Sequence, residues 1–411
     1  MENPQILHGH IHPMAVEVCQ ILKNHQHQAF IVGGCVRDLI LGQKPKDWDI
    51  TTSASPQEVI GLFAKTIPTG LQHGTVTVCM GESVENHFEV TTFRVEGEYS
   101  DGRRPNEVSF VKDVTQDLAR RDLTINAIAY DPISHDFVDP FGGVQDLKDH
   151  KIKAVGDPSA RFQEDGLRIM RVARFAARFG YNVDNDTFLG MHQSLKTLKK
   201  VSKERISNEL SKTLMSKFPF YGLTLLQDSG ALDIVCPLLA NQEWPLIFHI
   251  HDCGEMLETR LALLYNKISI KQVNEELINL KFSNKEIKRV LFLLELIEQF
   301  HFFKEQDTVS AYKAFMALVK NQSPDHWAVT LEQFIQLSMA MELGARTMLD
   351  KYSNEVVFAR KEMNINGDNL LDSGMLPGPH IKKVLDECYM EILRNPEHNN
   401  LPFLLNYSSK Q

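Results

Sequence analysis

The pair of acids in PKDWDITTS, residues 45–53, is the part of the sequence whose spacing most clearly suggests chemistry. Asp47 and Asp49 alternate with Trp48 in a segment typical of a β-strand, so both acidic side chains are expected on the same face. Two carboxylates held close together repel each other unless a cation or a proton is supplied. Mg²⁺ prefers such hard oxygen ligands and shares its coordination sphere with substrate phosphates. The pair therefore predicts a magnesium site that acts on a phosphate.

Two neighbouring features support this interpretation. Glu89, in HFEVTTFR (87–94), belongs to an adjacent expected strand and is the natural third acid. Gly33-Gly34 lies between an expected strand and an expected helix, where glycine lets the backbone approach a phosphate and free amides point toward an anion. An isolated Asp-x-Asp pair would more simply be an exposed edge strand. An acid pair that follows a phosphate-binding turn instead indicates phosphate chemistry.

The elements that must position these residues alternate between strand and helix in the first 150 residues. A short apolar strand ends at the glycines, the acid pair lies on a second strand, and Glu89 lies in a hairpin. The expected strands are 29–34, 48–53, 75–80 and 87–94, and the expected helices are 35–42 and 55–64, the second with Ser55 as its N-cap. From about residue 150 onward the patterns are helical. The sequence thus predicts an α/β head followed by an elongated helical body.

Size and composition limit the class of protein further. The chain has 411 residues, which is too long for one ordinary core and predicts several domains. No apolar run is long enough for a membrane span, and the N-terminal residues lack a secretory leader pattern. The six cysteines form neither a close-spaced metal-binding pair nor a disulfide framework. We therefore expect a cytoplasmic protein that does not associate with a membrane.

The net charge of −9 conceals an asymmetry along the chain. Residues 1–150 carry 12 Lys/Arg against 21 Asp/Glu, and residues 221–411 carry 18 against 25. Residues 151–220 carry 14 Lys/Arg against 7 Asp/Glu. A basic segment between acidic flanks is suited to holding phosphates, although by itself it would equally describe a pair of solvated charged helices.

Residues 33–53, GGCVRDLILGQKPKDWDITTS, resemble the signature of nucleotidyltransferases of the polymerase-beta-like superfamily. More narrowly, the chain resembles the class II tRNA nucleotidyltransferase and poly(A) polymerase family, in particular its bacterial CCA-adding members of the Bacillus type. Further segments carry this resemblance: FEVTTFR (88–94), ARRDLTINAIAYD (119–131), VDPFGGVQDLKD (138–149), RFQEDGLRIMRVARFAARFGY (161–181) and KERISNEL (203–210). The similarity is dense over residues 30–210, and the helical C-terminal half follows the family in length and general pattern.

The resemblance implies an α+β fold, in which a polymerase-beta-like head of mixed sheet and helices is followed by an elongated all-α neck, body and tail. The implied boundaries are 1–150 for the catalytic head, 151–220 for the base-selecting neck, 221–320 for the body and 321–411 for the tRNA-binding tail. The implied activity is template-independent addition and repair of the 3′-terminal CCA of tRNA from CTP and ATP, with Mg²⁺ as cofactor. The protein would act as a monomer or a homodimer.

Base selection is expected from Asp165 and Arg168 in the EDGLR segment. Residues i and i+3 of a helix lie on nearly the same face, so the two side chains would present an acceptor beside a donor fork. Cytosine and adenine both offer an exocyclic amine beside an acceptor ring nitrogen. Uracil and guanine offer a carbonyl beside a ring N–H, so both contacts would be like to like. Such a site rejects a wrong base by leaving buried polar groups unpaired.

The remaining arginines of this segment are expected to bind phosphates. At 100° per residue, Arg168, Arg171, Arg174 and Arg178 form one basic stripe that would face a triphosphate or an RNA backbone. Arg178 is expected to contact RNA or to form a salt bridge. With the resemblance, the residues assigned to the nucleotide are Gly34, Arg37, Arg121, Asp165, Arg168, Arg171 and Arg174, and those assigned to catalysis are Asp47, Asp49 and Glu89, the first two as metal ligands.

Two further segments bear on the choice of substrate. The loop VEGEYSDGRRPNE, residues 95–107, resembles the flexible loop of CCA-adding enzymes that CC-adding relatives lack, so it favours CCA addition. The basic patches Lys281-Lys285-Lys288-Arg289 and Lys382-Lys383 are candidates for holding tRNA, although such runs are commonly solvated helix faces. The alternatives are a CC-adding, A-adding or poly(A)-adding enzyme of the same family, and a catalytically inactive RNA-binding relative.

Overall fold

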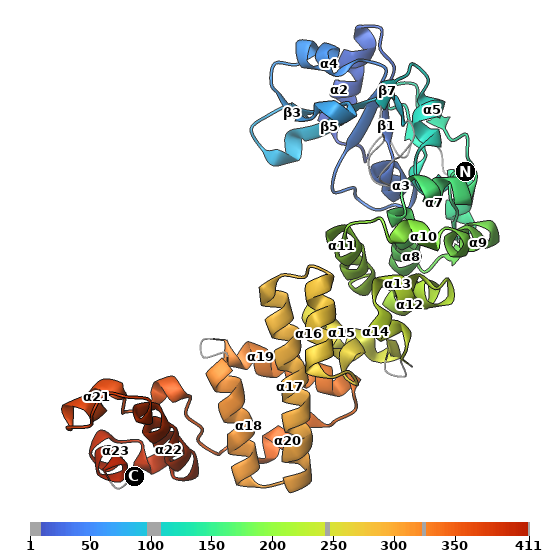
Figure 1. Ribbon diagram of the computed structural model, residues 1–411. Helices are drawn as coiled ribbons and strands as arrows, with labels where there is room; N and C mark the ends of the chain where they lie inside the picture. Colours follow the sequence, from blue (N-terminus) through green and yellow to red (C-terminus); the bar gives the residue numbers. More distant parts are fainter. Residues whose placement is uncertain (1–9, 97–107, 243–246, 323–325, 410–411) are drawn as a thin grey trace. The chain divides into compact units, whose positions relative to one another are not determined.

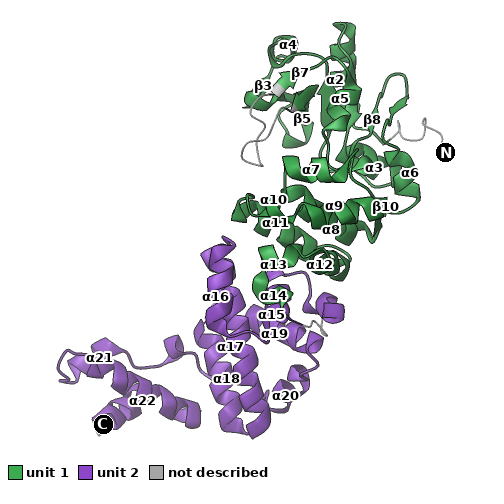
Figure 2. Cartoon of the chain, turned by 45° about the vertical axis from the view of Figure 1, so that its right-hand side comes forward, with its two compact units in different colours: residues 1–241 green, residues 242–411 purple. Residues whose placement is uncertain are grey.

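The computed structural model describes residues 10–96, 108–242, 247–322 and 326–409 (Figure 1). These residues form two compact units, one within residues 1–241 and the other within residues 242–411 (Figure 2). The first unit combines strands and helices, and the described part of the second contains helices and no strand. The α+β fold class is confirmed, and the finer division into head, neck, body and tail remains a prediction. Within the described ranges, no helix has the length and apolar character needed to cross a membrane.

Seven short strands form the main sheet of the first unit: β1 (Ala29–Val32), β2 (Asp49–Thr52), β3 (Thr66–Gly70), β4 (Thr75–Cys79), β5 (His87–Thr92), β8 (Ala129–Tyr130) and β9 (Phe137–Val138). Their order is β3-β4-β5-β2-β1-β8-β9. Strand β2 pairs antiparallel with β1 and parallel with β5, so the sheet is mixed. Strands β4 and β5 pair antiparallel, which confirms the expected hairpin. A separate antiparallel ribbon joins β6 (Arg94–Glu96) to β7 (Val108–Phe110).

Short helices accompany this sheet. They are α2 (Pro13–Asn24), α3 (Gly34–Ile40), α4 (Pro56–Leu62), α5 (Val114–Ala119) and α6 (Gly143–Lys148), with 3₁₀ turns η1 (Leu71–His73), η2 (Val84–Asn86) and η3 (Thr124–Asn126). The N-cap expected at Ser55 is confirmed, because Ser55 and Glu58 form a reciprocal capping box at the start of α4. Helix α3 begins at the second glycine of the Gly33-Gly34 turn, directly after β1.

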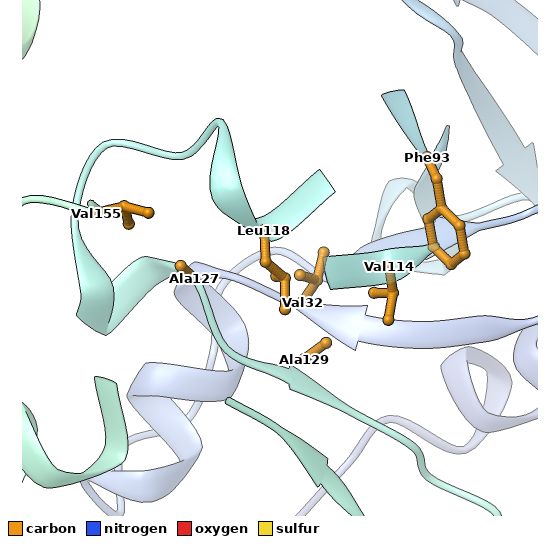
Figure 3. Close-up of a cluster of buried hydrophobic side chains, with 7 residues drawn as sticks. All are labelled: Val32, Phe93, Val114, Leu118, Ala127, Ala129 and Val155. Carbon is orange, nitrogen blue, oxygen red and sulfur yellow. The ribbon is translucent and has the colours of Figure 1, made fainter. Parts of the chain in front are cut away.

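One apolar cluster fixes the end of β1 against α5 (Figure 3). Figure 3 shows Leu118 of α5 beside Val32, the last residue of β1, with Val114 and Ala129 nearby. Leu118 is fully buried and Val32 is 2% exposed. Gly33 follows Val32 in the chain, and Arg121 lies shortly after Leu118. The same core therefore positions both the glycine turn and the arginine that the sequence assigns to the nucleotide.

Helices dominate the remainder of the first unit. They are α7 (Pro158–Glu164), α8 (Leu167–Phe179), α9 (Asn185–Gln193), α10 (Leu195–Leu198), α11 (Lys203–Leu214), α12 (Pro219–Asp228), α13 (Ala231–Val235) and α14 (Pro237–Ala240). The expectation that only helices follow residue 150 is wrong in one detail. Strands β10 (Lys151–Ile152) and β11 (Asn182–Val183) form a small parallel pair that ties the start of this region to the end of α8.

The second unit is built from helices around aromatic side chains. They are α15 (Leu257–Tyr265), α16 (Ile270–Asn279), α17 (Asn284–Gln306), α18 (Val309–Gln322), α19 (Trp327–Ala340), α20 (Ala345–Lys351), α21 (Gly367–Asp372), α22 (His380–Arg394) and α23 (Leu401–Ser408), with 3₁₀ turns η4 (Ile247–Cys253), η5 (Arg360–Glu362) and η6 (Pro396–His398). Phe300 and Phe303 of α17 pack against Phe315 of α18, and Phe300 also contacts Phe334 of α19. These contacts hold α17, α18 and α19 together.

Candidate active site

Three acids gather around the start of the central strand β2. Asp49 is the first residue of β2 and is half-buried, whereas Asp47 is exposed in the bend before the strand. The expectation that both acids lie within one strand is therefore wrong for Asp47, because the strand begins only after the buried Trp48. In the parallel pairing of β2 with β5, Asp49 lies directly opposite Glu89, which is exposed.

The surroundings of Asp49 disfavour its negative charge. Burial is the main cause, and the carboxylates of Glu89 and Asp47 add to it, so the pKa of Asp49 rises from 3.8 to about 6. Arg121 acts in the opposite direction, so its guanidinium also lies within electrostatic reach of Asp49. A cation bound here would relieve the repulsion among the acids. The cluster therefore fits a metal ion held by carboxylate oxygens.

The three acids are near one another but do not form a complete metal-coordination site by themselves. Among the described residues, no three His, Cys, Asp or Glu side chains are grouped tightly enough to enclose a metal ion. Asp47 and Asp49 remain the candidate ligands on the chemistry of their oxygens and their shared electrostatic environment. Direct coordination by Glu89 stays a prediction.

The turn after β1 brings backbone suited to phosphate close to these acids. Gly33 is the N-cap of α3 and has φ of +81°, a conformation that favours glycine. A Cβ at this position would lie 2.8 Å from Nη1 of Arg121. That guanidinium donates to the carbonyl of Asn126 at 3.4 Å and to the carboxylate of Asp117 at 3.3 Å. Arg121 is thus held against the glycine turn and within electrostatic reach of Asp49.

Arg37 lies on α3, the helix that follows the glycine turn, and its side chain is buried. Its side chain is 4% exposed, and it donates from Nε to Asp38 at 2.9 Å and from Nη1 to Asn126. The rings of Phe175 and Phe179 each lie 5.3 Å from the guanidinium carbon, a cation–π arrangement. Arg37 therefore shapes the site through its neighbours, and its direct contact with a nucleotide remains a prediction.

The base-selecting pair differs from the sequence expectation in its local structure. Asp165 is not on a helix with Arg168: it is extended, with φ −142° and ψ 107°, between the end of α7 and the start of α8. Gly166 separates the two helices and packs against the backbone of Thr197, where a Cβ would come within 2.6 Å. The expected helical spacing is therefore wrong for this pair. The two residues are nevertheless adjacent, because the amide of Arg168 donates to the carbonyl of Asp165 at 3.0 Å.

The side chains of this pair are held by other residues. Asp165 accepts two hydrogen bonds from Arg205 of α11, at 2.7 and 3.3 Å. Arg168 donates to Glu164 at 2.6 Å and to the carbonyl of Arg120 at 2.8 Å. An acceptor and a donor are thus both fixed close to each other, although each faces a protein partner.

The other arginines of α8 are also paired with carboxylates. The pairs are Arg171 with Asp122 at 2.6 Å, Arg174 with Glu209 at 2.7 Å, and Arg178 with Asp38 at 3.2 Å. The apolar residues opposite the stripe, Ile169, Met170, Ala173 and Ala177, are fully buried. The stripe is therefore present, and each of these three arginines meets a carboxylate of the same unit. Arg178 forms the expected salt bridge, and its contact with RNA remains a prediction.

Sequence reasoning missed the residues that hold these side chains. They are Asp38, Asp117, Arg205 and Glu209. Asp117 precedes Arg120 and Arg121 by three and four residues, a spacing typical of helical ion pairs, so it carried a usable signal. Arg205 is forty residues from Asp165 and carried none. Residues 97–107 of the loop that the sequence associates with CCA addition lie outside the described residues.

Comparisons with known proteins agree with this arrangement of a sheet-based head and helical remainder. Residues 29–153 match the family described as the poly(A) polymerase head domain, and residues 257–407 match tRNA nucleotidyltransferase domain 2. The CCA-adding enzyme of Lactococcus lactis subsp. lactis is 36% identical over 393 residues, which are 94% of each chain. That of Anoxybacillus flavithermus is 34% identical over 387 residues, again 94% of each chain.

A solved structure shows the same fold. The Bacillus stearothermophilus CCA-adding enzyme in complex with CTP has a TM-score of 0.76 and 28% sequence identity, covering 97% of this chain and 99% of that one. Fold and site together define a nucleotidyltransferase whose catalytic head precedes a helical remainder. The chain belongs to the family of CCA-adding enzymes, which are metal-dependent tRNA nucleotidyltransferases.

The glycine turn can be tested by adding a single methyl group. Gly33→Ala places a Cβ 2.8 Å from Arg121 at a positive φ, whereas Gly156→Ala has a similar φ of +66° and no atom within 4 Å of the new Cβ. Gly156→Ala should lower the free energy of unfolding by about 1–2 kcal/mol from backbone strain. Gly33→Ala should lower it by at least as much, because its φ of +81° and ψ of −129° lie outside the left-handed helical region. Only Gly33→Ala should raise the KM for nucleotide. Equal KM values for the two variants would contradict a role of the turn in nucleotide binding.

The charge of Asp49 should cost stability in the metal-free protein. Because the folded pKa is raised from 3.8 to about 6, the cost appears as the pH rises above 3.8 and is complete above 6. Asp49→Asn should therefore be more stable than the wild type, on the order of 1–3 kcal/mol at pH 8, with a difference about 1 kcal/mol smaller at pH 5. Urea unfolding in a chelator measures this, with the exposed Asp186→Asn as the control. An Asp49→Asn variant less stable than the wild type at pH 8 would contradict the conclusion that burial and neighbouring acids make the charge of Asp49 unfavourable.

Proposed function

We propose that this chain builds and repairs the 3′-terminal CCA of tRNA from CTP and ATP, with Mg²⁺ held by Asp47 and Asp49. The supporting observation is that acids, glycine turn and arginine meet in one place: Arg121 lies against Gly33 and also acts electrostatically on Asp49. In a nucleotidyltransferase this arrangement supplies one group for the metal and another for the triphosphate. The Bacillus stearothermophilus relative forms a complex with CTP, one of the two proposed nucleotides.

The proposed reaction is attack of the tRNA 3′-hydroxyl on the α-phosphorus of the nucleotide. The oxygen–phosphorus bond to the new residue forms as the bond to the β-phosphate breaks, and pyrophosphate leaves. Asp47 and Asp49 would hold the magnesium ion, which would lower the pKa of the attacking hydroxyl and neutralise charge on the leaving group. Glu89, opposite Asp49, adds negative charge that favours retention of the cation.

The triphosphate would lie along the glycine turn and against Arg121. Gly33 lacks a side chain where one would displace the guanidinium, so the backbone of the turn and Arg121 can approach the same phosphate. Gly34 would contribute backbone to the same turn, and Arg37 would keep the turn in place from behind, through Asn126 and Asp38. These residues orient the α-phosphorus toward the metal-binding acids.

We propose that Asp165 and Arg168 select the base. Asp165 presents an acceptor for the exocyclic amine of cytosine or adenine, and Arg168 presents a donor for the ring nitrogen. Because Arg168 now pairs with Glu164, base binding exchanges one partner of its guanidinium for another. The paired residues Arg171 and Arg174 would likewise exchange carboxylates for the nucleotide. A uracil or guanine would leave both selecting groups facing like groups.

The second unit would bind the body of the tRNA. Lys285, Lys288 and Arg289 of α17 line a cavity of about 600 Å³ together with His326. Arg289 donates to the hydroxyl of Thr330 at 2.8 Å, so the exposed lysines are the better candidates for phosphate contact. Free, buried cysteines are consistent with the reducing cytoplasm that we propose as its location. Action as a monomer or homodimer remains a prediction.

A nucleotide-omission assay tests the proposed function. With tRNA trimmed of its CCA end, CTP alone should add two residues, ATP alone none, and both together should complete the end. Arrest after two cytidines with both nucleotides would identify a CC-adding enzyme, and extension by ATP alone would identify an A-adding or poly(A)-adding one. Asp47→Ala and Asp49→Ala should each lower incorporation by about a thousandfold while tRNA binding survives. Asp186→Ala, at an exposed acid, is the control.

Base selection has its own test in Arg168→Ala. Loss of the donor should raise the use of UTP and GTP relative to CTP and ATP by about tenfold to a hundredfold. Competition assays with mixed nucleotides measure this ratio, and Lys200→Ala, which removes an exposed positive charge from the same unit, should leave it unchanged. Unaltered rejection of UTP and GTP by the Arg168 variant would remove the proposed selection mechanism.

A further inference from the structure

The carboxylate of Asp117 is buried between two arginines. Its side chain has no exposed surface, and its Oδ1 accepts hydrogen bonds from Nε and Nη2 of Arg120 at 3.0 and 2.7 Å. Its Oδ2 accepts a bond from Nη2 of Arg121 at 3.3 Å. One acid thus holds two guanidinium groups, and the local charge remains positive by one.

Asp117 also connects the surrounding strands. Its Oδ2 lies 3.4 Å from the hydroxyl of Thr51, two residues after Asp49 in β2. Its Oδ1 lies 3.4 Å from the backbone amide of Arg94, the first residue of β6. A single side chain therefore links the acid-bearing strand, the start of the β6–β7 ribbon and the arginine that lies against the glycine turn.

Burying an acid is unfavourable unless its partners compensate for lost hydration. Burial alone would raise the pKa of Asp117, but Arg120 and Arg121 outweigh it and keep the pKa below its usual range. The acid is thus ionised and hydrogen-bonded on both oxygens. A charged acceptor of this kind fixes the direction of each guanidinium that donates to it.

We propose that Asp117 is a positioning residue for the nucleotide. Its carboxylate holds the guanidinium of Arg121 against the Gly33 turn and fixes the position of that guanidinium relative to strand β2. The inference rests on the proposed role of Arg121 in holding the triphosphate. Arg120 satisfies much of the charge of Asp117, so Arg121 retains attraction for a phosphate. Without the carboxylate, two guanidinium groups would repel each other, and Arg121 would leave the turn.

The test is the KM for CTP in Asp117→Asn, a change that keeps the size of the side chain but removes its charge. The KM for CTP should rise about tenfold or more, because Arg121 is displaced from the triphosphate. The affinity for tRNA should stay within about twofold of the wild type. Asp117→Glu keeps the charge and should hold the KM within a fewfold of the wild type, even though its extra methylene lowers the Tm. Asp113→Ala, which removes the N-cap of the same helix, should lower the Tm without changing the KM.

A double-mutant comparison keeps the proposal testable even if Asp117→Asn folds poorly. Asp117→Asn/Arg121→Ala restores the local charge of the wild type, so it should fold, and its KM should equal that of Arg121→Ala alone. A further rise in KM in the double variant would overturn the proposal, as would a KM that follows the Tm across all variants. If Arg121→Ala itself leaves the KM unchanged, the proposed role of Arg121 fails instead, which separates the two conclusions.

Discussion

Pairing of arginine with carboxylate is the interaction on which the first unit depends. A buried guanidinium without a partner is strongly unfavourable in a low-dielectric interior. Helix α8 brings four arginines to the junction of sheet and helices, and each meets an acid from a different segment: Glu164, Asp122, Glu209 and Asp38. Because these acids lie before, far before and after α8 in the chain, the ion pairs fix the helix against the elements that carry the glycine turn and Arg121.

The same arginine–carboxylate pairs would have to be exchanged when a nucleotide binds at the proposed site. In the proposed site, an entering phosphate would replace a carboxylate at a guanidinium, so each arginine would have a negative partner before and after binding. The binding free energy from such an exchange would be the difference between an arginine–phosphate contact and an arginine–carboxylate contact, which is smaller than either contact alone. Such a site binds its nucleotide reversibly, as repeated addition to one RNA end requires. The carboxylates fix the positions of the arginines in advance, which would place them for the phosphates of the proposed site.

The metal-binding half of the site is organised differently. Backbone hydrogen bonds of the parallel β2/β5 pair place Asp49 opposite Glu89, so sheet register keeps like charges together in spite of their repulsion. Burial is the main reason that the pKa of Asp49 is raised, and the negative charges of Glu89 and Asp47 add to it. Opposite charges hold helix α8 in place, whereas the sheet tolerates unfavourable negative charge at Asp49 that a cation would relieve. The glycine turn and Arg121 connect these two halves.

The sequence by itself determined the elements and the chemistry of the site. Alternation of strand and helix signals, the Ser55 cap, the acid pair, the glycine turn and the family resemblance all follow from local spacing, and local spacing is preserved on folding. Only the tertiary structure decided that Asp165 lies outside the helix of Arg168, and that every arginine of the stripe meets an acid. Partners such as Arg205 for Asp165, forty residues away, have no signal in local spacing. Tertiary packing brings such partners together, and a buried charge is stabilised by an opposite charge that the fold places within reach.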